Sequence, residues 1–239
     1  MLQSIIGGNL SLTDLLLMFL SYAVVILVAL PVHEMAHGFM ADRLGDHTAR
    51  ACGRLTLNPF AHLDIFGTLM IILFGVGYAR PVPVNPYHFR KPKAGMALTA
   101  LAGPLSNFLM AAFAVGIFRV LVLFVNHMVI LRIAGLFLVA FFAGVNLSLA
   151  VFNLLPIPPL DGFRIISLVL PDKWVDFVNR YQTYITFAVL LVVFSGILNR
   201  PIAYLVYYME KAISFVFGFN PVIFSPTVYA TDLFEVFFS

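Results

Sequence analysis

Two histidines and a glutamate in the first fifth of the chain have a spacing that suits metal chemistry. The segment reads His33-Glu34-Met35-Ala36-His37, and side chains four residues apart lie on one face of a helix. Two imidazoles on one helical face can bind the same zinc ion in tetrahedral geometry. We therefore predict that His33 and His37 are metal ligands.

The glutamate between the histidines has a separate role in this interpretation. Glu34 follows His33 by about 100° around a helix, so it can approach a water molecule at the metal without being a ligand. A carboxylate so placed takes a proton from water whose pKa the metal has lowered. The alternative is a pair of core histidines near a glutamate. Ionisable groups inside an apolar segment are costly and usually functional, which favours the metal site.

A catalytic zinc site needs a third protein ligand and one open position. Asp161 is a candidate because it ends a proline-rich break, Asn153 to Gly162, at the end of an apolar segment. The competing interpretation is that Asp161 is a helix N-cap. His62 and Asp64, which open another apolar segment, are reserve metal candidates. Donor chemistry alone also admits three loop residues: Asp46, His47 and His88.

The composition indicates a membrane protein. The chain has 239 residues, of which 62% are hydrophobic and 10% are charged, and its mean hydropathy is +0.99. A soluble domain carries about a quarter charged residues, so the solvent of this chain must be mostly lipid. We expect an all-α polytopic membrane protein. Its net charge of +3 is explained by basic loop residues, so the expected partner is the lipid bilayer and no nucleic acid.

Five to six hydrophobic helical segments can be distinguished. Four are strong, at 12–41, 95–126, 131–155 and 181–198; a fifth, 202–219, follows the turn signal Asn199-Arg200-Pro201, and a shorter sixth covers 60–78. We expect a single integral-membrane domain over 1–239. Its catalytic core would be 12–170, and 180–239 would hold accessory transmembrane helices and an interfacial C-terminal tail.

The topology follows from requiring that the candidate site residues lie at one membrane face. The segment 60–78 must then enter and leave on the same side, which predicts a re-entrant piece. On that topology one face carries most of the basic residues: Arg43, Arg50, Arg54, Arg80, Arg90, Lys91, Lys93, Arg164, Lys173 and Arg180. Positive residues mark the cytoplasmic side. We therefore expect the active site near the cytoplasmic face of the membrane.

Two segments between the apolar stretches lack a helical period. Residues 48–57 and 78–86 contain proline, β-branched and aromatic residues, which predicts short β-strands or a hairpin near the site. A peptide in a membrane must keep its backbone groups hydrogen-bonded. An extended substrate could do so by pairing with such a strand edge.

Three motifs together resemble a known family. They are His33-Glu34-Met35-Ala36-His37-Gly38, Ala102-Gly103-Pro104-Leu105-Ser106-Asn107 and the segment from Asn153 to Asp161-Gly162. In this order they resemble the motifs of the site-2 protease family of intramembrane zinc metalloproteases, peptidase family M50. The chain resembles the compact bacterial members without a PDZ or CBS domain.

The resemblance implies roles for further residues. Asp161 would be the third ligand of one zinc ion per chain, and Asn153 would lie near the scissile carbonyl or the oxyanion. Asn107, Gly103 and Pro104 would position the site. The implied activity is hydrolysis of peptide bonds in or near transmembrane segments of a membrane protein or peptide. The alternatives are a membrane transporter and a non-catalytic metal-binding scaffold. The sequence leaves the substrate and the oligomeric state open.

Overall fold

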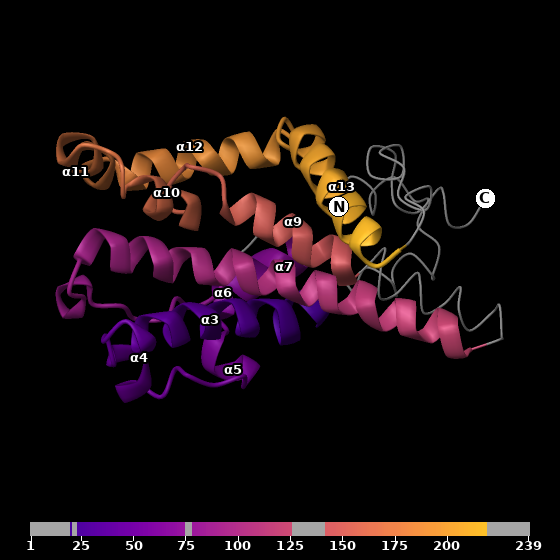
Figure 1. The fold of residues 1–239 in the computed structure, drawn as a ribbon. Coiled ribbons are helices and arrows are strands. Elements are labelled where there is room, and N and C mark those ends of the chain that lie inside the picture. The colour runs from indigo at the N-terminus through magenta and orange to yellow at the C-terminus, as the bar shows by residue number, and fades with distance from the viewer. Residues whose placement is uncertain (1–19, 21–22, 75–77, 126–141, 219–239) are drawn as a thin grey trace. The chain divides into compact units, whose positions relative to one another are not determined.

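The computed structural model describes residues 20, 23–74, 78–125 and 142–218, and this part of the chain is mostly helical (Figure 1). By its internal contacts the chain divides into an N-terminal unit, Met1–Gly103, and a C-terminal unit, Pro104–Ser239. The described helices are a π-helical turn at Val25–Ala29, α3 (Leu30–Arg43), α4 (Thr48–Ala51), α5 (Pro59–His62), α6 (Ile65–Phe74), a 3₁₀ turn at Pro86–His88, α7 (Pro92–Phe124), α9 (Gly144–Asn153), α10 (Asp161–Ile166), α11 (Asp172–Arg180), α12 (Gln182–Phe194) and α13 (Asn199–Val216).

Helix α3 organises the N-terminal unit and packs against α4 and α5 (Figure 1). It ends at Arg43, and Gly45 follows with a φ of 103°, a conformation that glycine adopts easily because it has no Cβ. Gly38 lets neighbouring segments approach α3 closely. A Cβ there would lie 2.8 Å from the side chain of Leu55 and 3.1 Å from that of Val82.

The segment after α5 leaves this unit's core and returns to it. Helix α6 has 10 residues and is therefore about 15 Å long, half of a bilayer's hydrocarbon core of about 30 Å. The backbone N–H of Arg80 donates a hydrogen bond of 2.7 Å to the carbonyl oxygen of His62. Gly67, on α6, lies so close to the backbone of Tyr78 that a Cβ would clash with its carbonyl oxygen. The two ends of the segment therefore lie together.

The predicted strands are wrong for the residues that the structure describes, since none of them forms a β-strand. Residues 48–51 are helix α4, and 78–85 have no regular secondary structure. Three prolines in 78–86 remove backbone donors. Two further donors are committed to side chains, because Val82 N–H donates to Glu34 and Asn85 N–H donates to Asp46. Too few groups are left for a sheet ladder.

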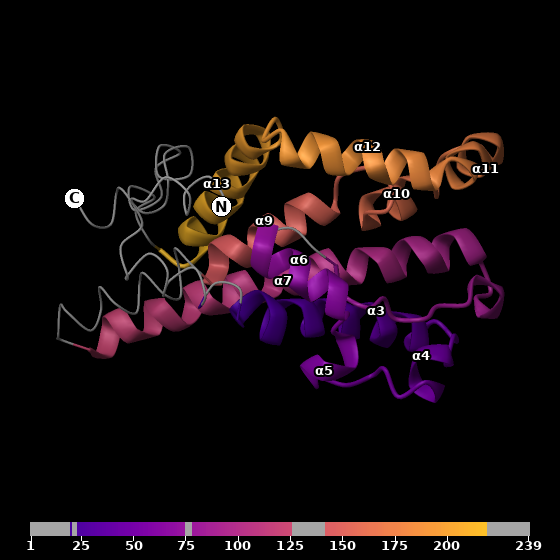
Figure 2. The same cartoon turned by 180° about the vertical axis from the view of Figure 1, so that it is seen from behind.

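The C-terminal unit has an apolar core between three helices, which Figure 2 shows from behind. Part of α7 contributes small side chains, Ala111, Ala114 and Val115. They pack with side chains of α9 and α13: Ala143, Leu147, Val151, Val206 and Ile213. Small residues at such contacts let helix backbones approach closely. Helix α11 packs against α12.

One described helix, α7, is long and apolar enough to cross a membrane. Its 33 residues give a length of about 50 Å. Exposed Leu101, Leu105, Leu109 and Phe113 recur every four residues, so they form one apolar stripe. Two further apolar helices, Gly144–Asn153 and Gln182–Val193, are shorter. Much of the predicted spans 12–41 and 131–155 lies outside the described residues, as does the predicted interfacial tail.

The predicted turn at Asn199-Arg200-Pro201 lies inside a helix. These residues are the first turn of α13, and the chain reverses before them, where Gly196 has a φ of 73°. Proline is tolerated in a first helical turn because its missing N–H has no acceptor there. The predicted segments 181–198 and 202–219 thus correspond to α12 and α13, with the break a few residues earlier.

Candidate metal centre

The two histidines of the motif face one another on α3. His33 and His37 are both buried, and their Nε2 atoms are 3.0 Å apart. Their rings meet edge to face, with centroids 4.6 Å apart. The helical spacing therefore produces the arrangement that the sequence predicts, in which two imidazole nitrogens share one small space.

A backbone carbonyl determines which nitrogen of His37 carries the proton. His37 Nδ1 lies 2.7 Å from the carbonyl oxygen of Thr99 on α7. A carbonyl only accepts hydrogen bonds, so Nδ1 carries the hydrogen and donates it. In the neutral ring Nε2 then carries the lone pair, and this atom lies 3.0 Å from Nε2 of His33. This is the tautomer that a metal ligand needs, and such an outer hydrogen bond is usual for metal-binding histidines.

Gly103 forms the wall of this space on α7. A Cβ at Gly103 would clash with Cε1 and Nε2 of His37 and would lie 2.6 Å from Cε1 of His33. No other residue type could therefore stand here without moving the imidazoles. Pro104 follows inside the helix, and a proline there removes one helical hydrogen bond and weakens its neighbours. The carbonyl that loses its helical donor is that of Ala100, four residues before Pro104.

The carboxylate of Glu34 is held by an extended segment. Its Oε2 accepts a hydrogen bond of 3.1 Å from the backbone N–H of Val82. Val82 is the only residue with an N–H in the run Pro81-Val82-Pro83. The neighbouring carbonyls of Arg80 and Pro81 accept hydrogen bonds from Arg54. One oxygen of Glu34 is thus fixed in direction.

The donor set fits a metal ion. His33, Glu34 and His37 each offer one ligand atom, and these atoms all lie within 4.8 Å of one another. The tautomer of His37 is set by Thr99. Gly103, which has no side chain, leaves space beside the facing nitrogens for an ion. Imidazole nitrogens with carboxylate oxygen suit zinc among the common biological metals.

The reserve candidates have other partners in the same unit. His62 is fully buried, and its Nε2 lies 2.7 Å from the carbonyl oxygen of Thr56. Asp64 accepts a 2.9 Å hydrogen bond from the N–H of Gly67, the arrangement of a helix N-cap at α6. Neither residue belongs to the described group of metal donors.

The remaining predicted site residues belong to the C-terminal unit. Asp161 is the first residue of α10, and Leu160 precedes it as the N-cap. Gly162 packs tightly, since a Cβ there would clash with the carbonyl oxygen of Leu154. Asn153, the last residue of α9, donates from Nδ2 to the carbonyl oxygen of Leu149 at 3.0 Å. This leaves its Oδ1 outside that bond.

Asn107, on α7, is fully buried. The hydroxyl of Ser106 lies 3.5 Å from Asn107 Oδ1, whereas Nδ2 has no hydrogen-bond partner among the described residues. Its side chain is therefore only partly satisfied, which is unusual for a buried amide.

Two groups at the site are absent from the sequence predictions. They are the carbonyl of Thr99 and the N–H of Val82, which contact His37 and Glu34. Both are backbone groups, so residue type carries no signal for them. The sequence hints at the role of Val82 only because Val82 lies between two prolines, which have no N–H to donate.

The helices and the His33–Glu34–His37 group, with its two buried histidines, define a helical protein with a candidate metal centre. Comparisons with known proteins give its family. The profile described as peptidase family M50 matches residues 21–196. The chain belongs to peptidase family M50. The predicted family and the prediction of a peptidase are thereby confirmed.

Named relatives agree with this assignment. YwhC of Bacillus subtilis (strain 168) is 41% identical over 174 residues, which are 72% of this chain and 78% of YwhC. Rip2 of Mycobacterium tuberculosis is 36% identical over 142 residues, which are 57% of this chain and 52% of Rip2. Both carry the name zinc metalloprotease. No solved structure gives a significant match.

Proposed function

We propose that the chain is an intramembrane zinc metalloendopeptidase that hydrolyses peptide bonds in or near transmembrane segments of membrane proteins. The observation that carries the proposal is the pair of imidazole Nε2 atoms 3.0 Å apart, with the tautomer of His37 set by Thr99. Membership of peptidase family M50 and the zinc metalloprotease names of the relatives support it.

Zinc is the metal that we assign to this site. His33 and His37 would supply two ligands, and Asp161 the third. The carboxylate of Asp161 would complete the three protein ligands that a catalytic zinc site uses. When bound, zinc acts as a Lewis acid that polarises a carbonyl group and acidifies water.

Glu34 would act as the general base. The Val82 N–H holds one carboxylate oxygen, and the other oxygen remains to take a proton from the attacking water. The same carboxyl group can then donate that proton to the peptide nitrogen, which leaves as an amine. Loss of such a base typically lowers the rate by about 10²- to 10⁴-fold.

Two asparagines would assist. Asn153 would polarise the scissile carbonyl or stabilise the oxyanion with its amide, and one such donor contributes about 10²- to 10³-fold. Its present bond to Leu149 is a local one that a substrate carbonyl could replace. Asn107, with Gly103 and Pro104, would keep α7 in the position that the site requires.

We further propose that 60–78 is re-entrant and that the site lies near the cytoplasmic face of a bacterial plasma membrane. The meeting of His62 with Arg80 and the short length of α6 support a segment that enters and leaves on one side. Irregular backbone is tolerated at membrane depth where protein covers it. The excess of basic residues on the same side supports the orientation.

One experiment tests the function. Wild type and Glu34→Gln are purified, their zinc content is measured, and cleavage of a model transmembrane substrate is followed in a bilayer, with cut sites mapped by mass spectrometry. We expect equal zinc in both proteins and cleavage within the transmembrane segment by the wild type alone. Equal cleavage by both, or no zinc in either, contradicts the proposal.

A further inference from the structure

A surface cavity of about 450 Å³ lies in the N-terminal unit, apart from the His33–Glu34–His37 group. Its lining includes Cys52, Arg54, Phe60, Arg80, Pro81 and Pro83. Two of these residues are basic, and none of the described lining residues is acidic. The cavity therefore has a positive lining without an internal counter-charge.

Arg54 is an unusual residue for such a position. It is more than nine-tenths buried, with a relative exposure of 8%. One terminal nitrogen donates to the carbonyl oxygen of Arg80 at 2.6 Å, which anchors the guanidinium to the extended segment. Its Nε is buried and has no partner among the described residues. An unpaired buried donor on a charged group is costly, so this arginine is unusual for its position.

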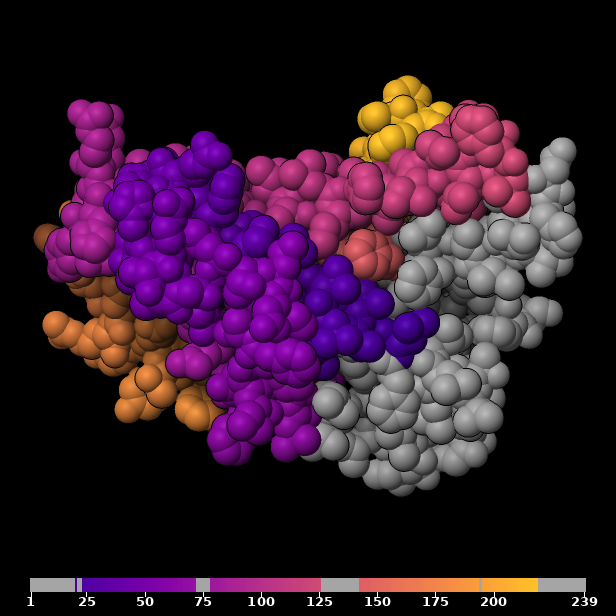
Figure 3. Space-filling view, turned by 90° about the horizontal axis from the view of Figure 1, so that it is seen from below, coloured from indigo at the N-terminus to yellow at the C-terminus, as the bar shows by residue number. Residues whose placement is uncertain are grey.

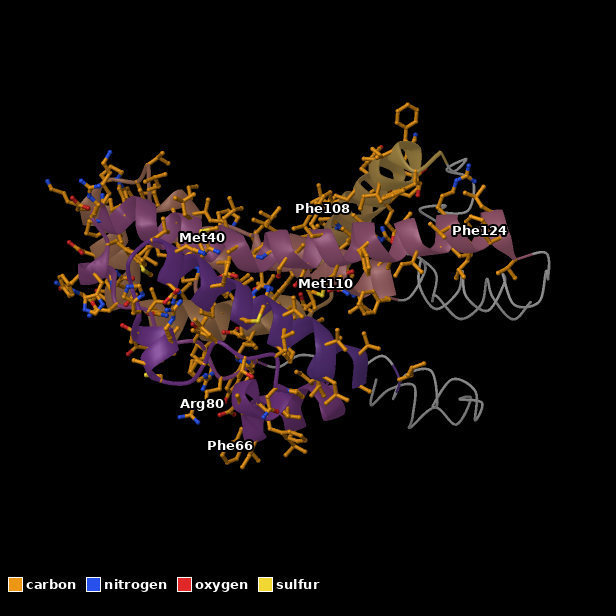
Figure 4. All side chains as sticks on the ribbon, turned by 60° about the horizontal axis from the view of Figure 1, so that its bottom comes forward. Met40, Phe66, Arg80, Phe108, Met110 and Phe124 are labelled. Carbon is orange, nitrogen blue, oxygen red and sulfur yellow. The ribbon has the colours of Figure 1, made fainter. Side chains whose placement is uncertain are left out.

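Arg80 supplies the second charge from the exposed side of the cavity. Its side chain projects outward from the N-terminal unit (Figure 4), and it forms no ion pair among the described residues. A buried guanidinium on one side and an exposed one on the other suit a phosphate group, which arginine binds through paired hydrogen bonds.

Large exposed apolar side chains lie in the cavity lining and on the neighbouring helix α6. Phe60, which lines it, is 78% exposed, and Ile65 and Phe66 on α6 are 84% and 72% exposed. Phe66 and Arg80 lie at the same edge of the unit in Figure 4, in agreement with the contact of Gly67 with Tyr78. Figure 3 shows this unit's surface in indigo to purple. Aromatic and aliphatic groups beside arginines are typical of the membrane–water interface.

We propose that this cavity binds the phosphate of an anionic phospholipid headgroup. The phosphate would lie between Arg54 and Arg80, and the acyl chains would lie against the exposed side chains of α5 and α6. Arg80 and Pro81 immediately precede Val82, whose N–H holds Glu34. A bound phosphate would therefore stabilise the segment that orients Glu34. Lipid composition would then affect the activity of the enzyme although the lipid does not contact the metal ligands.

The single cysteine of the chain provides a probe at the site. Cys52 is exposed and lines the cavity. The full chain is placed in nanodiscs of phosphatidylcholine, with or without phosphatidylglycerol, and the rate of Cys52 alkylation by uncharged N-ethylmaleimide is measured. We expect phosphatidylglycerol to slow alkylation, by about tenfold where the lipid reaches ten times its dissociation constant.

Variants make the test specific. Arg80→Ala changes an exposed side chain and should abolish the protection. Arg54→Lys keeps the charge but removes the planar fork, so it should weaken the protection. Arg90→Ala removes an equally exposed charge outside the cavity and should protect Cys52 like the wild type.

Three outcomes overturn the proposal. One is an equal alkylation rate with and without phosphatidylglycerol, and another is protection that persists in Arg80→Ala. The third is full protection by inorganic phosphate in phosphatidylcholine nanodiscs, which would assign the cavity to a free anion and not to a lipid.

Discussion

The Nδ1 atom of His37 lies 2.7 Å from the carbonyl oxygen of Thr99, which is 62 residues further along the chain. This contact connects α3, which carries the candidate ligands, to α7, which carries Gly103 and Pro104. It places the lone pair of His37 on Nε2, the atom that lies 3.0 Å from Nε2 of His33. A backbone group of the second helix thus determines the tautomer of a histidine on the first, which brings residues of both motifs together.

Gly103→Ala should reduce metal binding. The new Cβ would clash with His37 and press on His33, so the imidazoles must separate. We expect the affinity for zinc and the proteolytic rate each to fall by about tenfold or more, the effect expected when the surroundings of a ligand are disturbed. Zinc titration measures the first effect and substrate cleavage the second.

Gly116→Ala is the matched control on the same helix. A Cβ there would lie 3.0 Å from the ring of Phe217, at the end of a side chain that can move. Zinc affinity should stay at the wild-type value in this variant. Wild-type zinc affinity in Gly103→Ala would show that the wall has no role.

Val82→Pro should lower the turnover number while zinc stays bound. Among the described residues, the N–H of Val82 is the one that donates to Glu34; the substitution removes it and keeps an apolar side chain. A hydrogen bond to a charged group contributes about 1.5–3 kcal/mol, which corresponds to about a 10- to 100-fold decrease in kcat. Val84→Pro is the control, because its N–H makes no hydrogen bond among the described residues. Equal kcat values in both variants would contradict a positioning role.

Asp161→Ala and Asp64→Ala should have opposite effects. Loss of a ligand at Asp161 should lower zinc content and abolish cleavage. Asp64 caps α6, so its loss should leave zinc bound and lower stability by about 1 kcal/mol. Metal analysis and thermal unfolding separate the two. Normal zinc in Asp161→Ala with loss of zinc in Asp64→Ala would transfer the ligand role to the reserve candidate.

Acid should destabilise the loop around Asp46. Burial raises the pKa of the Asp46 carboxyl, but hydrogen bonds from Thr48, the N–H of Asn85 and His88 hold this pKa below its ordinary value of 3.8. A folded-state pKa below the unfolded one stabilises the fold above the unfolded value, and the effect is lost as pH falls below 3.8.

Asp46→Asn tests this contribution. The variant should be less stable than the wild type at pH 7, by about 1–3 kcal/mol for charged hydrogen bonds, and should lose less stability between pH 5 and 3. Exposed Asp176→Asn is the control. Thermal unfolding at both pH values measures the difference, and parallel pH profiles for wild type and Asp46→Asn would refute it.

Several features could be predicted because they depend on local sequence. The spacing of His33 and His37 determines their common helical face, since the period of a helix is fixed by backbone geometry. The composition and the long apolar run of α7 indicate a protein that lies in lipid, because the environment a segment prefers depends on its residue types. Three motifs in order identify the family.

The short strands could not be predicted correctly. Residues 78–86 include types that favour strands, and most of this segment has no helix. A strand also needs partners for its backbone groups, and in this segment those of Val82 and Asn85 contact Glu34 and Asp46 instead. Side chains from distant positions thus replaced the expected ladder.

The sequence by itself determined the metal chemistry, since two imidazoles and a carboxylate at these spacings can meet at one ion on a single helix. Only the tertiary structure decided how those groups are oriented. The tautomer of His37 and the direction of Glu34 depend on a carbonyl at Thr99 and an N–H at Val82. Every residue carries a carbonyl, and all but proline carry an N–H, so no residue type marks the ones that folding brings to the site.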